Sequence, residues 1–351
     1  IADSVGILVE GSLFAKGDAA HPVTITRHDD GKAWSTIEVR QGGHLDLAST
    51  LVEGGGNPNG SDLSTVAAID VRGDQTASPQ EVFRAKDVTV TSSASVGVLL
   101  REGGGFTSDS ANLTIDLGAS YPVSSWANAA GSIPAGGDFA GNAIDKIKLV
   151  GDGARDGILV DTTFKKLDVP YFVAGSELTV GKQGSSPLLT IETGTTIQFA
   201  KLSRLVVDGN DDAAFGALAA DGVVFTSGED TPAAGDWVGI LAHGSADPRT
   251  KIANSRIAYA GAESQISSYG CPSVTTDGSN IGALVIYSSA APSSAWITGT
   301  TIESSARDGI VRGWTGDAVD FAASNTFTNV ANCKQTLPKT SSACGEPGAC
   351  K

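Results

Sequence analysis

The chain reads DGVVFTSG at residues 221–228, GDWVGI at 235–240 and KIANSRIAYAG at 251–261. Each run is short, contains β-branched or aromatic residues and is bounded by Gly, Asp or Pro, as is typical of β-strands between turns. In the first run Val223 and Phe225 fall on the same face, so that face can be buried. None of the runs has the length or spacing of an amphipathic helix. This part of the chain is therefore predicted to be short strands joined by tight bends.

The same four blocks occur near the start of the chain, in the same order. The first copy is GSLFAKG at 11–17, PVTIT at 22–26, WSTI at 34–37 and ASTLVEGG at 48–55; the second is SRLVVDG at 203–209, VVFT at 223–226, WVGI at 237–240 and NSRIAYAG at 254–261. Internal repetition at this scale indicates a solenoid or propeller. Trp34 and Trp237 hold the same place in the repeat, so we expect both to be buried in equivalent positions.

The order G-x-L-x-A-x-G, P-V-T-I-T, W-x-x-I, S-x-I-x-x-x-G resembles the right-handed parallel β-helix repeats of secreted and outer-surface bacterial proteins. The resemblance rests on two good copies and several degenerate ones, and so covers most of the chain. It implies an all-β fold, a right-handed parallel β-helix (solenoid). It does not imply one function, because this fold hosts lyases, hydrolases, adhesins, passenger domains and inert scaffolds.

The domain organisation follows from length and composition. The chain has 351 residues, of which 40% are hydrophobic, enough for a continuous core. We expect residues 1–165 and 166–330 to form the two halves of one β-helix, because no Gly/Ser-rich or Pro-rich spacer separates them. Residues 331–351 are expected to form a Cys-rich C-terminal cap pinned by disulfides.

The charge balance limits the partners. The net charge is −15 and the pI is about 4.6. Nucleic acid is disfavoured as a partner, because phosphate binding needs clustered Lys and Arg. No apolar run is long enough to span a membrane. The composition favours an acidic surface facing an aqueous, extracellular medium.

All four cysteines lie late in the chain, at Cys271, Cys333, Cys344 and Cys350. They form no C-x-x-C pair and the histidines are distant in sequence, so a zinc site is disfavoured. Disulfides near the C-terminus indicate an oxidising compartment, which places the protein outside the cell or on its outer surface. Bridges between Cys344 and Cys350 and between Cys271 and Cys333 are geometrically plausible, and other pairings remain open.

One cluster could carry lyase chemistry. In β-helix lyases Asp and Glu hold Ca²⁺ and a basic residue removes a proton, and Asp152, Arg155, Asp156 and Asp161 supply these groups. The sequence RDGI at 155–158 recurs at 307–310, however, so this element is equally explained as a structural turn. No cofactor is predicted.

The run Asp208–Asp212 begins like a calcium loop. It lacks the Gly and the bidentate Glu that such a loop needs, so only adventitious Ca²⁺ binding is left open there. The pairs Asp29–Asp30 and Asp211–Asp212 resemble the paired carboxylates of hydrolases, but both are predicted to lie in turns.

The least regular stretch is Gly118–Asn142, which carries Tyr121, Trp126 and Phe139 among small residues. Long loops that leave a solenoid often line a binding face, so these aromatics are candidate ligand contacts. The competing interpretation is that they are buried against the β-helix.

The leading functional hypothesis is a non-catalytic secreted or cell-surface β-helix that serves in adhesion, carbohydrate contact or assembly. The alternative is a polysaccharide lyase or glycoside hydrolase that acts on an acidic polysaccharide. The expected partners are a carbohydrate or another surface protein. Ile1–Phe14 begins inside a strand-like segment with no cap in this sequence, so this N-terminal edge is expected either to continue into preceding chain or to self-associate with a neighbouring copy.

Overall fold

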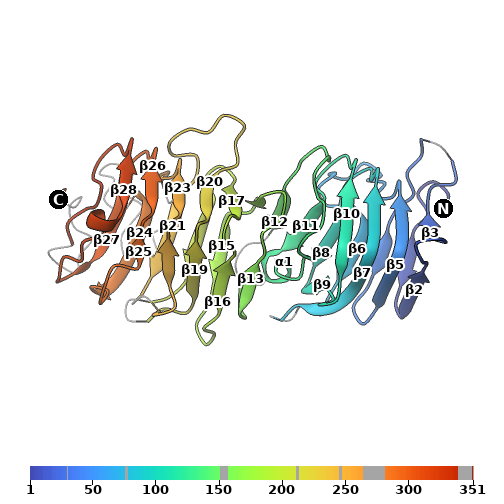
Figure 1. Ribbon diagram of the computed structural model, residues 1–351, viewed down its shortest axis with the longest axis horizontal. Helices are drawn as coiled ribbons and strands as arrows, with labels where there is room; N and C mark the ends of the chain where they lie inside the picture. Colours follow the sequence, from blue (N-terminus) through green and yellow to red (C-terminus); the bar gives the residue numbers. More distant parts are fainter. Residues whose placement is uncertain are drawn as a thin grey trace. The chain divides into compact units, whose positions relative to one another are not determined.

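The computed structural model describes residues 1–29, 31–75, 78–150, 157–210, 213–244, 247–263, 281–338 and 350. It divides into two compact units, which are Ile1–Val150 with Lys165–Tyr171 (unit 1) and Gly151–Phe164 with Phe172–Lys351 (unit 2). Almost all of its secondary structure is β, arranged in long parallel sheets (Figure 1). The prediction of an all-β, parallel architecture is therefore confirmed.

Unit 1 contains two parallel sheets. Sheet A of unit 1 has the order β1 (Ile7–Val9), β4 (Ile37–Val39), β6 (Ala67–Arg72), β8 (Val96–Arg101), β11 (Val123–Trp126) and β12 (Ile147–Val150). Sheet B has the order β10 (Ala111–Asp116), β7 (Gln80–Thr91), β5 (His44–Glu53) and β2 (Ser12–Lys16), with β3 (Val23–Ile25) paired to β5 and β9 (Gly104–Phe106) paired to β7. The short helix α1 (Ala127–Ala130) follows β11.

Unit 2 contains three parallel sheets. Sheet A of unit 2 consists of β17 (Thr196–Phe199), β20 (Val224–Ser227), β23 (Arg256–Ala258), β26 (Thr301–Glu303) and β28 (Thr326–Thr328). Sheet C consists of β15 (Glu177–Val180), β18 (Arg204–Val207), β21 (Gly239–His243), β24 (Gly282–Ala290) and β27 (Asp308–Thr315). Sheet D consists of β13 (Thr162–Phe164), β16 (Leu188–Ile191), β19 (Ala217–Asp221), β22 (Lys251–Ala253) and β25 (Ile297–Thr298). The 3-10 turn η1 (Ala322–Ser324) precedes β28, and β14 (Tyr171–Val173) spans the boundary between the units.

The chain visits the three sheets of unit 2 in a fixed rotation. From β15 to β27 successive strands belong to sheets C, D and A in turn, so each strand pairs with the third strand after it. Parallel neighbours always need a crossover connection, and here the other two strands of the cycle provide it. The pairing in unit 2 therefore repeats every three strands.

Sharp bends separate the strands where the sequence has small or polar residues. Asn254, between β22 and β23, adopts a φ of 47°, and Gly222, at the end of the neighbouring strand, adopts 68°. The Gly222 N–H donates to the Ala253 carbonyl at 2.9 Å, so the two bends are stacked. Gly and Asn tolerate this left-handed conformation best. Ile252 and Ile257, on either side of the bend, are fully buried as predicted.

Trp34 and Trp237 are fully buried, which confirms their predicted equivalence. The indole N–H of Trp34 donates to the Glu53 carbonyl at 2.8 Å, and that of Trp237 donates to the Ala258 carbonyl at 2.8 Å. Both acceptors end a strand in the fourth block of their repeat copy. The repeat therefore preserves the buried ring together with its hydrogen bond.

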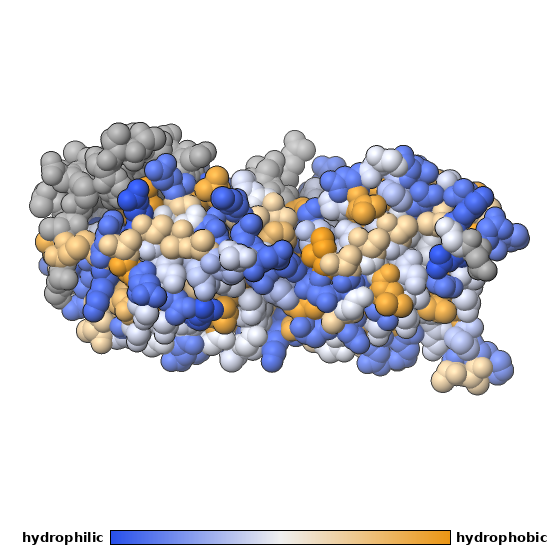
Figure 2. All heavy atoms as spheres, turned by 90° about the horizontal axis from the view of Figure 1, so that it is seen from above, coloured by the Kyte–Doolittle hydropathy of each residue, from blue (hydrophilic) through white to orange (hydrophobic). Residues whose placement is uncertain are grey.

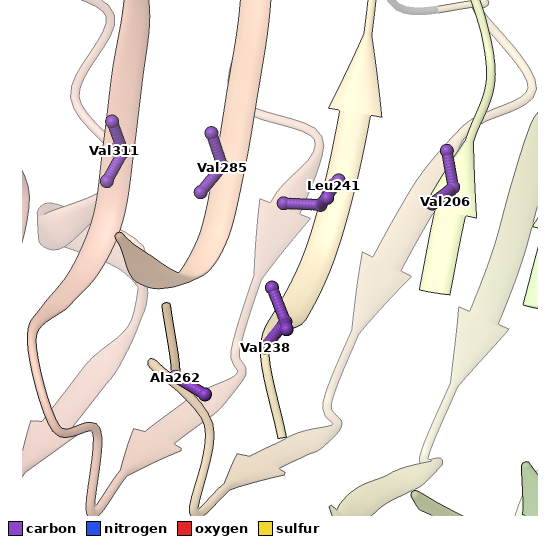
Figure 3. Close-up of a cluster of buried hydrophobic side chains, with 6 residues drawn as sticks. All are labelled: Val206, Val238, Leu241, Ala262, Val285 and Val311. Atoms are coloured by element: carbon purple, nitrogen blue, oxygen red, sulfur yellow. The ribbon is translucent and has the colours of Figure 1, made fainter. Parts of the chain in front are cut away.

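Sheet C is buried on both faces. Leu205, Ile240 and Leu284 are in register on one face and fully buried. The other face carries a second apolar cluster, which consists of Val206, Val238, Leu241, Ala262, Val285 and Val311 (Figure 3). Parallel sheets are normally covered on both sides, and the near-continuous apolar sequences of these strands fit that rule.

The exposed surface is mixed in character. Figure 2 shows hydrophilic residues interspersed with small groups of hydrophobic ones on the face that it presents. The exposed large hydrophobic residues are Val5, Leu8, Phe14, Leu63, Leu117, Leu202 and Leu337. Three of these seven precede Lys16, so exposed apolar side chains are concentrated at the first two strands.

The C-terminal segment covers the open edge of β27. The Gly309 N–H donates to the Cys333 carbonyl at 2.8 Å, and the Thr336 N–H donates to the Ile310 carbonyl at 3.0 Å. Cys350 in turn forms an antiparallel bridge with Thr336. The tail thus pairs with a strand edge that would otherwise be open.

The favoured disulfide pairings are wrong. Cys333 is bonded to Cys350, with 5.0 Å between their Cα atoms, which excludes both Cys344–Cys350 and Cys271–Cys333. The reason is that the antiparallel bridge of Cys350 with Thr336 brings it beside Cys333, an arrangement that spacing in the sequence does not reveal. Cys271 and Cys344 lie outside the described residues.

Candidate functional site

Tyr121 and Trp126 lie on one face of unit 1, whereas Phe139 does not join them. Val123 and Ser125 of β11 point into the core and are fully buried, so Ser124 and Trp126 belong to the opposite face of sheet A. Tyr121, just before β11, packs half-buried against an apolar cluster of β6 and β8. Phe139 is fully buried and therefore unavailable to a ligand at the surface.

We call Tyr121, Ser124, Trp126 and Lys148 the aromatic–lysine cluster. Ser124 of β11 is the register partner of Lys148 of β12, so their side chains are neighbours on the same face. The Lys148 ammonium lies 5.3 Å from the centroid of the Tyr121 ring, in cation–π geometry. Trp126 is two residues further along β11, at the half-buried end of the strand.

Burial affects both titratable groups of the cluster. Burial lowers the pKa of Lys148, and the nearby Asp62 carboxylate opposes this effect. Burial also raises the pKa of Tyr121, to which the charge of Asp62 adds. Among the described residues no carboxylate lies within ion-pair distance of Lys148. The cluster therefore presents a partly desolvated cation against an aromatic ring.

A ladder of arginines and carboxylates follows the same face of sheet A. Arg72 contacts Glu38 at 3.1 Å and Asp70 at 3.5 Å. Arg40 contacts Glu38 at 3.3 Å and Glu10 at 3.1 Å, and Arg101 forms a further ion pair with Asp70. Each arginine of this ladder has a carboxylate partner, so the ladder is internally neutralised and its lysine neighbour stands apart from it.

A second group of titratable residues lies in unit 2, at the end of sheet C. His243 of β21 and Tyr287 of β24 are register partners, with ring centroids 5.3 Å apart. Asp208 follows β18 on the adjacent strand, and its carboxylate accepts the Gly209 N–H at 2.8 Å. Burial raises the pKa of Asp208, and the charge of Glu177 acts in the same direction.

Glu177 begins β15, so it lies at the opposite end of the sheet C strands from Asp208. Its Oε2 atom accepts from Arg204 Nη2 at 2.6 Å, and its Oε1 atom accepts from the Thr179 hydroxyl at 2.9 Å. Sheet C thus has a carboxyl group of raised pKa at one end of its strands and a carboxylate fixed by an ion pair at the other.

The predicted lyase cluster lies largely outside the described residues. Asp152, Arg155 and Asp156 lie outside the described residues. Asp161 is exposed, and its carboxylate accepts the Leu188 N–H at 2.8 Å at the start of the neighbouring strand. This contact is structural. Within the described part of the chain, no three His, Cys, Asp or Glu side chains are placed to hold a metal ion.

Sequence reasoning missed Lys148 and Ser124. The alternation in Ile147-Lys-Leu-Val150 places the lysine on the outer face, but the sequence gives no sign of its neighbour on β11. Asp208 was identified only as the start of a calcium-like run, and its neighbours His243 and Tyr287 were missed, because strand register alone brings the three together.

Comparisons of the chain with protein-family models, curated proteins and solved structures find no match. In the part of the chain that the structure describes, no helix is long and apolar enough to cross a membrane.

Proposed function

We propose that this chain is a right-handed parallel β-helix, secreted or displayed on the outer cell surface, that contacts carbohydrate without catalysing a reaction. The fixed rotation of strands among sheets C, D and A supports the fold. The Cys333–Cys350 disulfide supports an oxidising compartment. The aromatic–lysine cluster supports the proposed carbohydrate contact, because it joins two partly exposed aromatic rings to a few polar groups on a rigid sheet.

This chemistry suits a sugar. Carbohydrate sites pair the apolar C–H faces of a ring with aromatic side chains, and a few placed polar groups fix its orientation. Tyr121 and Trp126 are both half-buried, so each ring is anchored yet retains exposed area. Because Ser124 and Trp126 belong to β11, the strand fixes their spacing without further ordering cost.

Replacing Trp126 with alanine is expected to weaken polysaccharide binding roughly tenfold or more, since truncating an aromatic anchor commonly costs more than about 1.4 kcal/mol. Binding is measured by affinity electrophoresis across neutral and acidic polysaccharides, then by calorimetry on the best ligand. The matched control is Leu117→Ala, which removes an exposed hydrophobic side chain that follows β10 of the same unit. Equal losses in both variants would remove the cluster as the binding site.

Catalysis on a polysaccharide is the second candidate function, and the row at the end of sheet C favours it. Asp208 with its raised pKa has the character of a general acid, and His243 and Tyr287 lie at the same end of the sheet. Reducing-sugar and unsaturated-uronate assays on acidic polysaccharides separate the two functions. Robust turnover that is lost in Asp208→Asn, or in Asp156→Ala, would overturn the non-catalytic proposal.

We further propose that two copies associate through the N-terminal edge. In the described residues β1 pairs only with β4, and β2 pairs only with β5, so both strands have one open edge. Leu8 is 49% exposed and Phe14 is 57% exposed on these strands. An open edge with apolar side chains is a template for pairing with another chain.

Leu8→Lys is expected to convert an associating species to monomer, because a charge on an edge strand opposes pairing. Leu8→Pro should act alike by removing an edge donor, because Ile7 and Val9 bond to β4 and the N–H of Leu8 is the one that faces the open side. Mass is followed by light scattering, with circular dichroism to confirm folding. Leu63→Lys, at a 40% exposed leucine outside the edge strands, serves as the control. An assembly that persists in Leu8→Lys, or a wild-type chain that is strictly monomeric, contradicts this interface.

A further inference from the structure

We propose that the aromatic–lysine cluster binds the carboxylate of a uronic-acid residue, so that the protein prefers saccharides with isolated carboxylates over neutral ones. This inference rests on the proposed carbohydrate contact and adds the chemical class of the ligand. It is carried by three features of the cluster, which are an ammonium without an anionic partner among the described residues, a buried hydroxyl without a partner in the same set, and the aromatic rings beside them.

The first feature is the lysine. The chain has 39 Asp and Glu against 24 Lys and Arg, so carboxylate partners are abundant. Arginines of the same sheet use them, as Arg72 does with Glu38 at 3.1 Å. The Lys148 ammonium, by contrast, pairs with the Tyr121 ring and with no carboxylate of the described structure. A half-buried cation without an anion is unfavourable, so the position calls for an anionic ligand.

The second feature is the hydroxyl of Ser124. Ser124 is 1% exposed, and its Oγ atom has no hydrogen-bond partner among the described residues. Buried hydroxyls are almost always paired, so an orphaned one marks a place where a partner belongs. Ser124 and Lys148 are register partners, so their donors lie side by side on one face. A carboxylate has two oxygens and can accept from both donors, the Lys148 ammonium first and the Ser124 hydroxyl once the side chains that cover it move aside.

The third feature explains why the carboxylate belongs to a sugar. Tyr121 lies under the Lys148 ammonium, and Trp126 lies two residues beyond Ser124, about 7 Å along the strand. A uronic acid supplies both groups, because its ring can stack on an aromatic side chain while its carboxylate reaches the ammonium. A simple carboxylate would use the cation and leave the aromatic surface unused.

The surrounding charge selects against dense polyanions. The chain carries a net charge of −15, and the charge of Asp62 reaches both Lys148 and Tyr121. A homopolymer of uronates meets this repulsion along its whole length, whereas a chain with one terminal or occasional uronate meets it only locally. Salt screens this long-range repulsion more than it screens the contact between the carboxylate and Lys148. Added salt should therefore narrow the difference in affinity between the uronate homopolymer and the chain with an occasional uronate.

The test uses the full chain and a matched pair of oligosaccharides, one ending in glucuronate and the other in glucose. Wild-type protein is expected to bind the glucuronate ligand roughly tenfold more tightly, as a charge-assisted contact supplies about that factor. Lys148→Met should abolish the preference while retaining affinity for the glucose ligand, and Lys148→Arg should keep most of it. Lys86→Met, an exposed lysine on β7 of the same unit, is the control and should bind as wild type.

The outcomes separate the two proposals. If Trp126→Ala weakens binding of both ligands while Lys148→Met leaves their ratio unchanged, the carbohydrate contact stands and the carboxylate subsite is overturned. If wild-type protein binds neither ligand, both fail. If Lys148→Met lowers affinity for both ligands equally, the lysine has a packing role and the subsite is likewise overturned.

A second readout follows the lysine itself. The Lys148 amine is reductively methylated with ¹³C, and its titration is followed by NMR with and without ligand. Glucuronate ligand should raise the pKa of Lys148, because a bound anion favours the charged amine. Acetate at the same concentration should leave the pKa unchanged. An equal rise with acetate would show a generic anion site and contradict recognition of the sugar.

Discussion

Trp237→Ala is expected to lower the free energy of unfolding by about 3–5 kcal/mol. The indole is fully buried and stacks on Phe199 with ring centroids 4.1 Å apart and planes 4° from parallel. Its N–H also donates to the Ala258 carbonyl at 2.8 Å, so truncation leaves a cavity and removes that carbonyl's partner. The effect is measured by urea denaturation followed by circular dichroism and by thermal melting.

Trp34→Ala should lower the free energy of unfolding by about as much as Trp237→Ala, because Trp34 holds the equivalent position in the first repeat copy. The Trp34 ring is fully buried and fills the space beside Gly55, where an added Cβ atom would lie 2.6 Å from the ring. Trp126→Ala is the control, since this indole is half-buried and should contribute much less. A cost for Trp237→Ala no larger than that of the control would show that the repeat does not place this ring in the core.

The repeat could be recognised from sequence because its determinants are local. β-Branched and aromatic residues alternate within single strands, and small residues stand where the chain bends. The bend at Asn254 and the buried Ile252, Ile257 and Trp237 all follow from such patterns. These predictions need no knowledge of which strand lies beside which.

The candidate site could not be recognised in full because it depends on register. Tyr121 and Trp126 were identified as aromatics in an irregular stretch, but Lys148 becomes their neighbour only through the pairing of β11 with β12. A shift of one residue in that register would turn Lys148 toward the core. The same stretch also contains Phe139, whose burial is decided by tertiary packing and not by composition. Sequence reasoning thus found the aromatic half of the site and missed its polar half.

The disulfide shows the same limit. Spacing along the chain made Cys344 the natural partner of Cys350, but pairing is decided by which strand edge the tail occupies. The Cys333 N–H donates to the Asp308 carboxylate at 2.9 Å, and the Thr336 N–H donates to the Ile310 carbonyl at 3.0 Å. These bonds fix the segment along β27, and Cys350 reaches Cys333 from there.

Removing this disulfide is expected to destabilise the C-terminal end of unit 2 by about 3 kcal/mol, as the bridge closes a loop with a sequence separation of 17 residues. The variant is Cys333→Ala with Cys350→Ala, which leaves Cys271 and Cys344 in place. Hydrogen exchange should show faster opening at Ile310, because the segment that covers its strand edge is no longer tethered.

Non-reducing peptide mapping of the wild type supplies the control, and it should link the peptide of Cys333 to that of Cys350. Exchange at Leu205, in β18 of the same sheet, should be unaffected, since its strand is paired on both sides. An unchanged melting temperature with unchanged exchange at Ile310 would mean that the backbone bonds alone hold the tail on β27. In that case the backbone hydrogen bonds between the tail and β27 cover the strand edge without help from the disulfide. Pairing of another chain with this edge should then remain blocked even in reducing conditions.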